Sequence, residues 1–239
     1  MFPIRDTIPS RHTPVATWLL IAVNVLVFLF EIANPAPLVE RMTYLFGIVP
    51  ARYTNPDWAQ SVGFPASYWP FVTSMFLHGG WLHVIGNMWA LWIFGDNVED
   101  RMGPLRFLLF YTICGVAAGI VHLLTNAGST VPAIGASGAI AGVMAAYFIL
   151  FPKARIVAMF PIVFWPVFFE VPAFLYLGFW FFVQFFSGAT ALLSPERASG
   201  IAWWAHIGGF ATGALSFWMF LRPRPRPLTR DHFSRGGFA

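Results

Sequence analysis

Six long apolar runs, separated by polar or proline-broken segments, are the main pattern along this 239-residue chain. A helix that crosses a bilayer core of about 30 Å needs about 20 mostly apolar residues. The runs predict helices over residues 17–32, 81–94, 105–124, 133–151, 172–186 and 201–221. The fold class expected from this pattern is an all-α polytopic membrane protein with six transmembrane helices.

The same pattern divides the chain into three parts. Residues 1–16 form a polar N-terminal segment, residues 17–221 form the six-span membrane domain, and residues 222–239 form a basic, proline-rich tail. No small-residue cleavage site follows the first apolar run, so we interpret that run as a retained first span and not as a signal peptide.

Two of the connections between predicted spans are too long to be simple turns. Residues 33–70 are rich in proline and aromatic residues and are too polar to cross a bilayer, so we expect them to lie at the membrane interface. Residues 156–172 contain Glu170 and are broken by prolines. They predict an interfacial or partly embedded segment before the fifth span.

Composition strengthens the membrane interpretation. Hydrophobic residues make up 58% of the chain and charged residues only 10%, whereas a soluble domain usually carries about 25% charged residues. This composition excludes an ordinary water-soluble domain. Cys114 is the single cysteine, so an intrachain disulfide is impossible.

The net charge of +4 is explained by topology, and no nucleic-acid partner is expected. An even number of spans places both termini on one side, and 11 of the 14 Lys and Arg residues fall on that side. Those residues are Arg5, Arg11, Arg101, Arg106, Lys153, Arg155, Arg222, Arg224, Arg226, Arg230 and Arg235, and the opposite side carries Arg41, Arg52 and Arg197. The positive-inside rule then predicts cytoplasmic termini and places the start of the fourth span near the outer face.

Polar residues within the apolar runs are the candidates for chemistry, because a polar group in a bilayer costs free energy unless it is paired or hydrated. "HGGWLHVIGN" holds His78, His83 and Asn87, of which His83 and Asn87 are four residues apart and share one helical face. Zinc is disfavoured because Asn is a poor ligand and no carboxylate lies beside the histidines, so no metal is expected. Two donors on one face suit the stabilisation of an oxyanion better.

Ser137 and His206 form the second set of candidates. Pro132 is expected to open the fourth span, which places Ser137 near a helix start where backbone N–H groups lack helical acceptors. His206 lies in the sixth span at a comparable predicted depth. Small residues on both helices allow close contact between them, which would bring the imidazole to the hydroxyl. These packing residues are Gly135, Gly138 and Gly142 on the fourth span and Gly209 and Gly213 on the sixth.

Each polar residue also has a purely structural interpretation. A serine among small residues is, by itself, more often part of a helix-packing surface, and a lone transmembrane histidine more often makes a structural hydrogen bond. The two sets together supply a nucleophile, a base and oxyanion donors at similar depth. No Asp or Glu is available at that depth, so a Ser–His dyad is favoured over a triad.

The chain resembles the rhomboid family of intramembrane serine proteases. The resemblance is carried in order by "HGGWLHVIGN", by "GASG" at 135–138 and by "AHIGGFATG" at 205–213. "GDNVEDRMG" at 95–103 is also similar to the family's inner loop after the second span. The resemblance covers about residues 71–220.

This resemblance implies hydrolysis of peptide bonds within the transmembrane segments of protein substrates, in the lipid bilayer and without a cofactor. It implies that Ser137 is the nucleophile and His206 the general base and acid. The oxyanion hole would be formed by His83, Asn87 and the Ser137 N–H, and His78 would help to order the water-filled cavity. Residues 33–70 would rest in the membrane, and about residues 172–200 would be linked to substrate entry.

Two positions depart from the pattern of the family, and one alternative stays open. Some rhomboids carry an aromatic residue four positions after the serine, where this chain has Ala141, and "YWP" at 68–70 replaces the Trp-Arg of some bacterial members.

The short tails resemble a minimal bacterial form, so a bacterial inner membrane is expected. The alternative function is an inactive rhomboid-like binding or translocation factor. A channel is disfavoured because the polar residues gather near one face.

Overall fold

The computed structural model describes residues 2–162, 165–193 and 202–223. Most of the basic tail expected at 222–239, and Arg197, lie outside the described residues. The longer helices are α1 (Val15–Ala33), α2 (Ala36–Phe46), α6 (Trp81–Met102), α7 (Pro104–Thr125), α8 (Ser137–Leu150), α9 (Ala173–Leu193) and α10 (Trp203–Ser216). The short helices are α3 (Ala51–Thr54), α4 (Pro56–Ser61), α5 (Pro70–Thr73) and the 3-10 turns Ser74–Phe76 and Phe217–Phe220.

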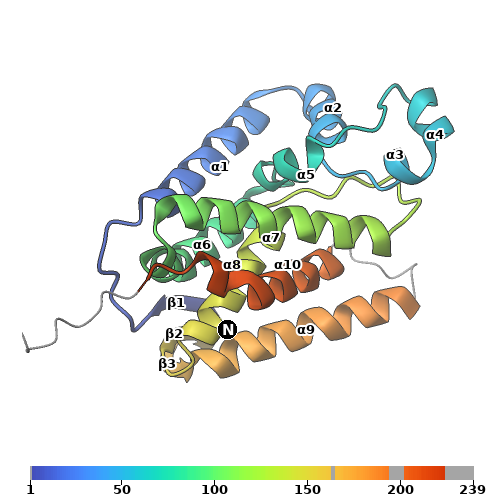
Figure 1. The fold of residues 1–239 in the computed structure, drawn as a ribbon. Coiled ribbons are helices and arrows are strands. Elements are labelled where there is room, and N and C mark those ends of the chain that lie inside the picture. The colour runs from blue at the N-terminus through green and yellow to red at the C-terminus, as the bar shows by residue number, and fades with distance from the viewer. Residues whose placement is uncertain (1, 163–164, 194–201, 224–239) are drawn as a thin grey trace, which may run out of the picture.

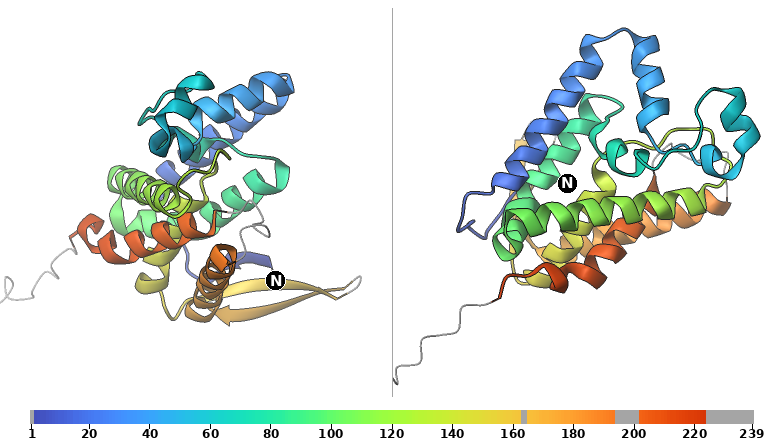
Figure 2. Two further views of the ribbon diagram at one scale, coloured as in Figure 1. Left: turned by 90° about the vertical axis from the view of Figure 1, so that its right-hand side faces the viewer. Right: turned by 45° about the horizontal axis from the view of Figure 1, so that its top comes forward.

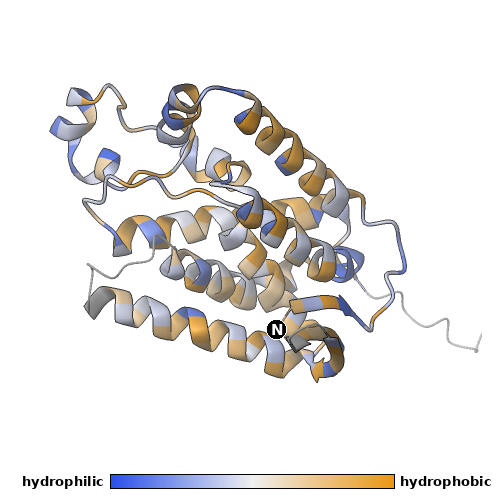
Figure 3. Cartoon of the chain, turned by 180° about the vertical axis from the view of Figure 1, so that it is seen from behind, coloured by the Kyte–Doolittle hydropathy of each residue, from blue (hydrophilic) through white to orange (hydrophobic). Residues whose placement is uncertain are grey.

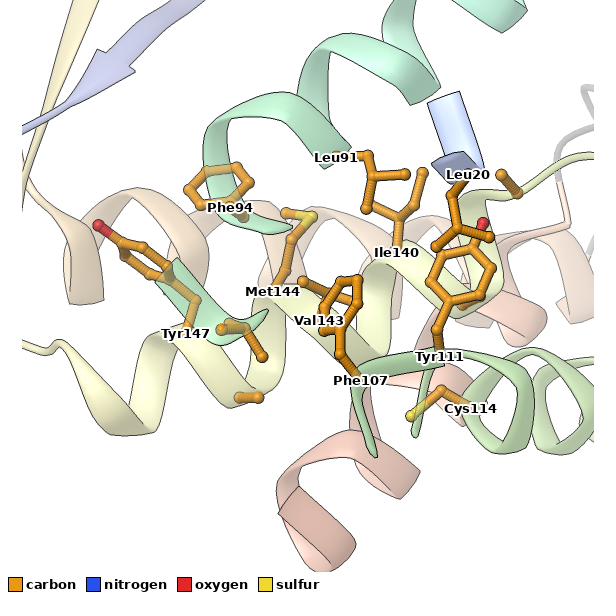
Figure 4. Packing of buried hydrophobic residues seen from close by; sticks show 14 of the residues in the cluster. Leu20, Leu91, Phe94, Phe107, Tyr111, Cys114, Ile140, Val143, Met144 and Tyr147 are labelled. Carbon is orange, nitrogen blue, oxygen red and sulfur yellow. The ribbon is translucent and has the colours of Figure 1, made fainter. Parts of the chain in front are cut away.

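Helix α8 lies at the centre of the bundle, between α6, α7 and α10 (Figure 1). Every residue from Gly138 to Tyr147 is buried, and a helix that is apolar all round belongs in a core. Figure 4 shows Ile140, Val143 and Met144 of α8 among apolar side chains of the neighbouring helices. Those neighbours include Leu20, Leu91, Phe94, Phe107, Tyr111 and Cys114.

Glycines let α8 and α10 approach until their backbones touch. A Cβ atom on Gly209 would overlap the carbonyl of Gly138, and one on Gly213 would overlap the carbonyl of Gly142. Such small residues allow close helix contact within a membrane. Gly135 does not belong to this surface, because it precedes α8 and faces His83. The expectation that Gly135 packs these two helices is therefore wrong.

Among the described residues, three helices are long and apolar enough to cross a membrane, namely α1, α7 and α9 over residues 173–191. Many large apolar side chains of α1 and α9 are exposed, and both helices are largely coloured as hydrophobic in Figure 3. Helix α6 has charged residues at its C-terminal end, and α8 and α10 have only 14 residues each. The chain is thus a mostly helical membrane protein, and the count of six spans stays a prediction.

A three-stranded antiparallel sheet contradicts the all-α expectation. Its strands, in the order β1-β2-β3, are Phe2–Asp6, Arg155–Ile162 and Trp165–Pro172. The prolines within 156–172 exclude a helix, and pairing into a hairpin satisfies the backbone groups of this segment. Residues 2–6, part of the segment 1–16 that we expected to be polar and outside the membrane domain, pair with β2 as a further strand of the sheet.

The segment "GDNVEDRMG" is helical up to Met102 and is not the loop that its resemblance suggested. Helix α6 continues because no break occurs before Gly103, which has a φ of +81° and precedes Pro104. Glu99 is thereby held against the start of α1. It accepts hydrogen bonds from the Ala16 N–H at 3.0 Å and from the Thr17 N–H and hydroxyl at 2.8 Å. These bonds satisfy donors that a helix start leaves open.

The connection 33–70 folds into α2, α3 and α4, and a buried arginine holds it together. The Arg52 guanidinium donates to the carbonyls of Tyr44, Leu45 and Pro65 at 2.8–3.2 Å. Tyr68 and Trp69 of the "YWP" segment are highly exposed. The location of this connection at a membrane interface stays a prediction.

Candidate active site

Helix α8 begins at Ser137, four residues later than Pro132 suggested. The preceding segment is extended, because Ala133 pairs with Ile48 through two backbone hydrogen bonds of 2.8 and 3.0 Å. The Gly135 N–H then donates to the Ser74 carbonyl, and its φ of +122° favours glycine. Ser137 is therefore the first helical residue, whose N–H has no acceptor within the helix.

His206 on α10 faces Ser137 directly. Its Nε2 lies 2.7 Å from the Ser137 Oγ, a normal hydrogen-bond distance. The close glycine contact between α8 and α10 explains how short side chains on two separate helices meet. The structure thus brings together the two residues for which a dyad was expected.

The other ring nitrogen of His206 lies against Gln184 on α9. The Gln184 Oε1 is 2.7 Å from Nδ1, and Gln184 is buried. Gln184 is a polar residue within the apolar run that predicts the fifth span. That polarity is the signal by which the sequence distinguishes it from its neighbours, whereas its partner comes from a different helix.

Two tryptophans lie near the His206 ring. The ring centroid of Trp180 is 6.0 Å away with an interplanar angle of 36°, and that of Trp203 is 6.4 Å away at 88°. Ala141, where some rhomboids carry an aromatic residue, is fully buried. Aromatic contact with the histidine therefore comes here from α9 and from the start of α10.

His83 and Asn87 lie on the same side of α6 and face the backbone before Ser137. A Cβ atom on Gly135 would lie 2.6 Å from His83 Nε2 and 3.5 Å from Asn87 Nδ2. Asn87 Nδ2 is buried and has no hydrogen-bond partner among the described residues. It is therefore a donor available to a group that enters here.

A cavity of about 660 Å³ joins these side chains. Its polar lining includes His83, Asn87, His122, Asn126, Ser137 and His206. A space of this size accepts a short peptide segment or a cluster of waters, both of which a hydrolytic reaction in a membrane requires.

His78 lies behind His83, outside the residues that line this cavity. The two rings meet edge to face with their centroids 5.0 Å apart, and the backbone N–H of His78 donates to the Glu31 carboxylate at 3.2 Å. Glu31 on α1 is buried, and sequence reasoning missed it although a carboxylate within an apolar run is a strong signal. His78 is thus placed to support His83, while its direct ordering of the cavity stays a prediction.

The arrangement contains the groups that acyl transfer needs. It has a hydroxyl, an imidazole in contact with it, and the unpartnered Asn87 amide in the lining of the same cavity. Within the described residues, no group of three His, Cys, Asp or Glu side chains is placed to hold a metal ion.

Comparison with known proteins identifies relatives of this chain. The family model of the Rhomboid domain matches residues 65–223. The chain is 32% identical over 134 residues to Rhomboid protease GluP of Bacillus subtilis, which covers 56% of this chain and 24% of that protein. It is 30% identical over 151 residues to the mitochondrial Rhomboid protein 1 of Saccharomyces cerevisiae, covering 62% of this chain and 40% of that protein.

Other relatives come from organelles as well. The chain is 42% identical over 82 residues to the chloroplastic Rhomboid-like protein 11 of Arabidopsis thaliana, covering 34% of this chain and 29% of that protein. The chain spans less than half the length of the relatives named here. Because mitochondrial and chloroplastic proteins stand beside a bacterial one, the expectation of a bacterial inner membrane is not supported.

Proposed function

The chain belongs to the rhomboid family, and from this premise we propose that it is an intramembrane serine endopeptidase. Its substrates are the transmembrane segments of other membrane proteins. The proposal is carried by one observation, the 2.7 Å contact between the Ser137 hydroxyl and His206 Nε2. An inactive relative has no need to keep this contact inside a polar cavity.

The first half of the reaction forms an acyl-enzyme. As the Ser137 Oγ attacks the scissile carbonyl carbon, its proton moves to His206 Nε2. The carbonyl oxygen gains negative charge, which the Asn87 amide, the His83 ring and the Ser137 N–H stabilise. His206 then donates the proton to the leaving nitrogen as the peptide bond breaks.

The second half repeats this chemistry with water. A water molecule in the cavity gives a proton to His206 Nε2 while its oxygen attacks the ester carbon. The bond to Ser137 Oγ breaks, and Ser137 recovers its proton from His206. The two products leave with a new carboxyl and a new amino terminus.

The start of α8 favours the developing charge at Ser137. Peptide dipoles give a helix N-terminus a partial positive charge, and the first N–H groups point outward. The basic excess on the side of the two termini supports an orientation in which Ser137 lies nearer the opposite, outer face.

The test is labelling of the purified, membrane-reconstituted protein with a fluorophosphonate, together with cleavage of a transmembrane substrate. Ser137→Ala should abolish both, and His206→Ala should reduce both to background. Ser216→Ala is the matched control, because Ser216 in α10 bonds to the Thr212 carbonyl and is not among the residues that line the cavity. Cleavage that survives Ser137→Ala, or a wild-type protein that neither labels nor cleaves, would contradict the proposal and favour a binding factor.

A further inference from the structure

Helix α9 contributes a third polar group to the Ser137–His206 pair. We propose that Gln184 is a positioning residue, whose amide oxygen keeps the His206 proton on Nδ1 so that Nε2 faces Ser137 as a base. This inference rests on the proposed function.

The chemistry of the two partners supports this assignment. A neutral imidazole carries one proton, on either nitrogen, and an amide oxygen only accepts hydrogen bonds. The 2.7 Å contact from Gln184 Oε1 to Nδ1 therefore requires the proton on Nδ1. The lone pair of Nε2 then points at the Ser137 hydroxyl, 2.7 Å away.

An amide suits this site better than a carboxylate. A permanent negative charge in the bilayer would carry a large desolvation cost, whereas an amide costs far less. When the ring gains a proton in the reaction, the same amide oxygen accepts a stronger, charge-assisted hydrogen bond.

Gln184 and Trp180 lie one helical turn apart on α9, and both contact the His206 ring. One helix thus fixes the protonation of the ring and packs near its face. Ala141 of α8 is too small to provide that packing.

The experiment measures fluorophosphonate labelling of Ser137 across a range of pH for Gln184→Leu and Gln184→Glu in liposomes. Gln184→Leu keeps the size but removes the acceptor, and labelling should slow roughly 10- to 100-fold. Gln184→Glu places a carboxylate beside the protonated ring, so the acidic limb of the profile should move up by about one pH unit or more. Phe179→Leu is the control, because Phe179 is an exposed residue of the same helix.

A purely structural Gln184 would slow labelling in both variants without moving the profile, and that result would overturn the inference. Wild-type labelling speed in Gln184→Leu would overturn it too. Failure of the proposed function is distinct, because the wild-type protein would then not label at Ser137 at all.

The β2–β3 hairpin exposes several large apolar side chains. We infer that this hairpin lies on a lipid surface, in the interfacial layer at the end of the bundle remote from Ser137. The inference does not depend on proteolysis.

In the outer part of strand β3, from Trp165 to Phe169, both faces are apolar and exposed. Trp165, Val167 and Phe169 point to one face and are 78%, 43% and 37% exposed, while Phe168 points to the other face and is 59% exposed. A sheet beside water usually keeps one polar face, which this outer part of the hairpin lacks. Contact with lipid explains two apolar faces.

The position of the hairpin beside α9 also supports contact with lipid. It leads directly into α9, which is long and apolar enough to cross the membrane. In the left view of Figure 2, α9 is seen nearly along its axis and the hairpin extends sideways past it. A hairpin at a steep angle to a spanning helix runs along the membrane surface.

The charged residues at the base of the hairpin and the apolar residues beyond them favour a position in the interfacial layer of the membrane. From Phe160 to Phe169 the sequence contains no charged residue, and at the base Arg155 pairs with Glu170 at 3.6 Å beside Lys153. The basic residues suit anionic headgroups, and aromatic residues favour the interface. Pro166 and Pro172 remove N–H donors from edge strand β3, which discourages the addition of a strand from another protein.

The experiment uses full-length protein with Cys114→Ala, so that one introduced cysteine carries a nitroxide. In liposomes of phosphatidylcholine and phosphatidylglycerol, labels at Trp165→Cys and Phe168→Cys should collide with oxygen more than with a water-soluble nickel chelate. Lys153→Cys should show the opposite preference. Water exposure at both hairpin positions would overturn the inference, and so would spin–spin broadening that shows a second copy covering the hairpin.

Discussion

Gly209 on α10 faces the carbonyl of Gly138 on α8, with no space for a side chain between the two backbones. Gly209→Ala should therefore force the helices apart and lower the free energy of unfolding by about 1–3 kcal/mol. Labelling at Ser137 should fall as well, because the Ser137–His206 contact lengthens. Thermal unfolding in detergent measures the first effect. Gly178→Ala on α9 is the control, since its nearest neighbour would be an ordinary 3.9 Å from the new Cβ atom.

Asn87→Ala should lower kcat roughly 10- to 1000-fold with little change in KM, because an oxyanion donor acts mainly in the transition state. Steady-state cleavage in liposomes measures both constants. Asn126→Ala should change kcat far less, because the Asn126 amide bonds to the His122 carbonyl within the same cavity wall. Equal losses in the two variants would contradict an oxyanion contact by Asn87.

Glu99→Ala should destabilise the protein by roughly 2–4 kcal/mol, because the buried donors at the start of α1 lose their acceptor. Urea or thermal unfolding measures the change. Glu170→Ala removes a glutamate from an exposed pair with Arg155 and should cost no more than about 1 kcal/mol. Similar losses in the two variants would contradict the capping contact.

Asp96 lies on α6 beyond the predicted span at 81–94, near Asp6 and Asp100. Burial, together with the charges of Asp6 and Asp100, raises the pKa of Asp96 to about 6. The folded state thus binds more protons than the unfolded state between about pH 4 and 6. Stability should fall as pH rises through that window and level off above it.

Comparison of the melting temperature at several pH values, for wild type and Asp96→Asn, tests this dependence. Asp96→Asn should reduce the loss of stability between pH 4 and 6, while Asp57→Asn, at an exposed position of α4, should keep the wild-type dependence. An unchanged profile in Asp96→Asn would contradict the assignment.

Much of the helical fold follows from hydrophobic pattern alone. The range 17–32 became α1 at Val15–Ala33, and 105–124 became α7 at Pro104–Thr125. These ends are marked locally, by proline at one end and by polar residues at the other. The serine and both histidine motifs were also visible, because polar residues stand out within apolar runs.

Features that depend on distant partners were not predictable in the same way. Strand β1 forms only because β2, about 150 residues later, offers its edge. Helix α8 begins as late as Ser137 because Ala133 pairs with Ile48, and the local sequence at 133 does not predict that bridge. The contact of Gln184 with His206 depends on how α9 is rotated about its axis, which periodicity alone leaves open.

Because α8 begins as late as Ser137, the helix is short compared with the thickness of a membrane. At 1.5 Å per residue its 14 residues extend about 21 Å, some 9 Å less than a typical hydrocarbon core. With α8 as the predicted fourth span, we expect the Ser137 hydroxyl to lie below the bilayer surface by an amount set by acyl-chain length. Shorter chains would bring headgroups and bulk water closer to the serine, so for the proposed protease we expect the thickness of the host membrane to affect the rate of hydrolysis.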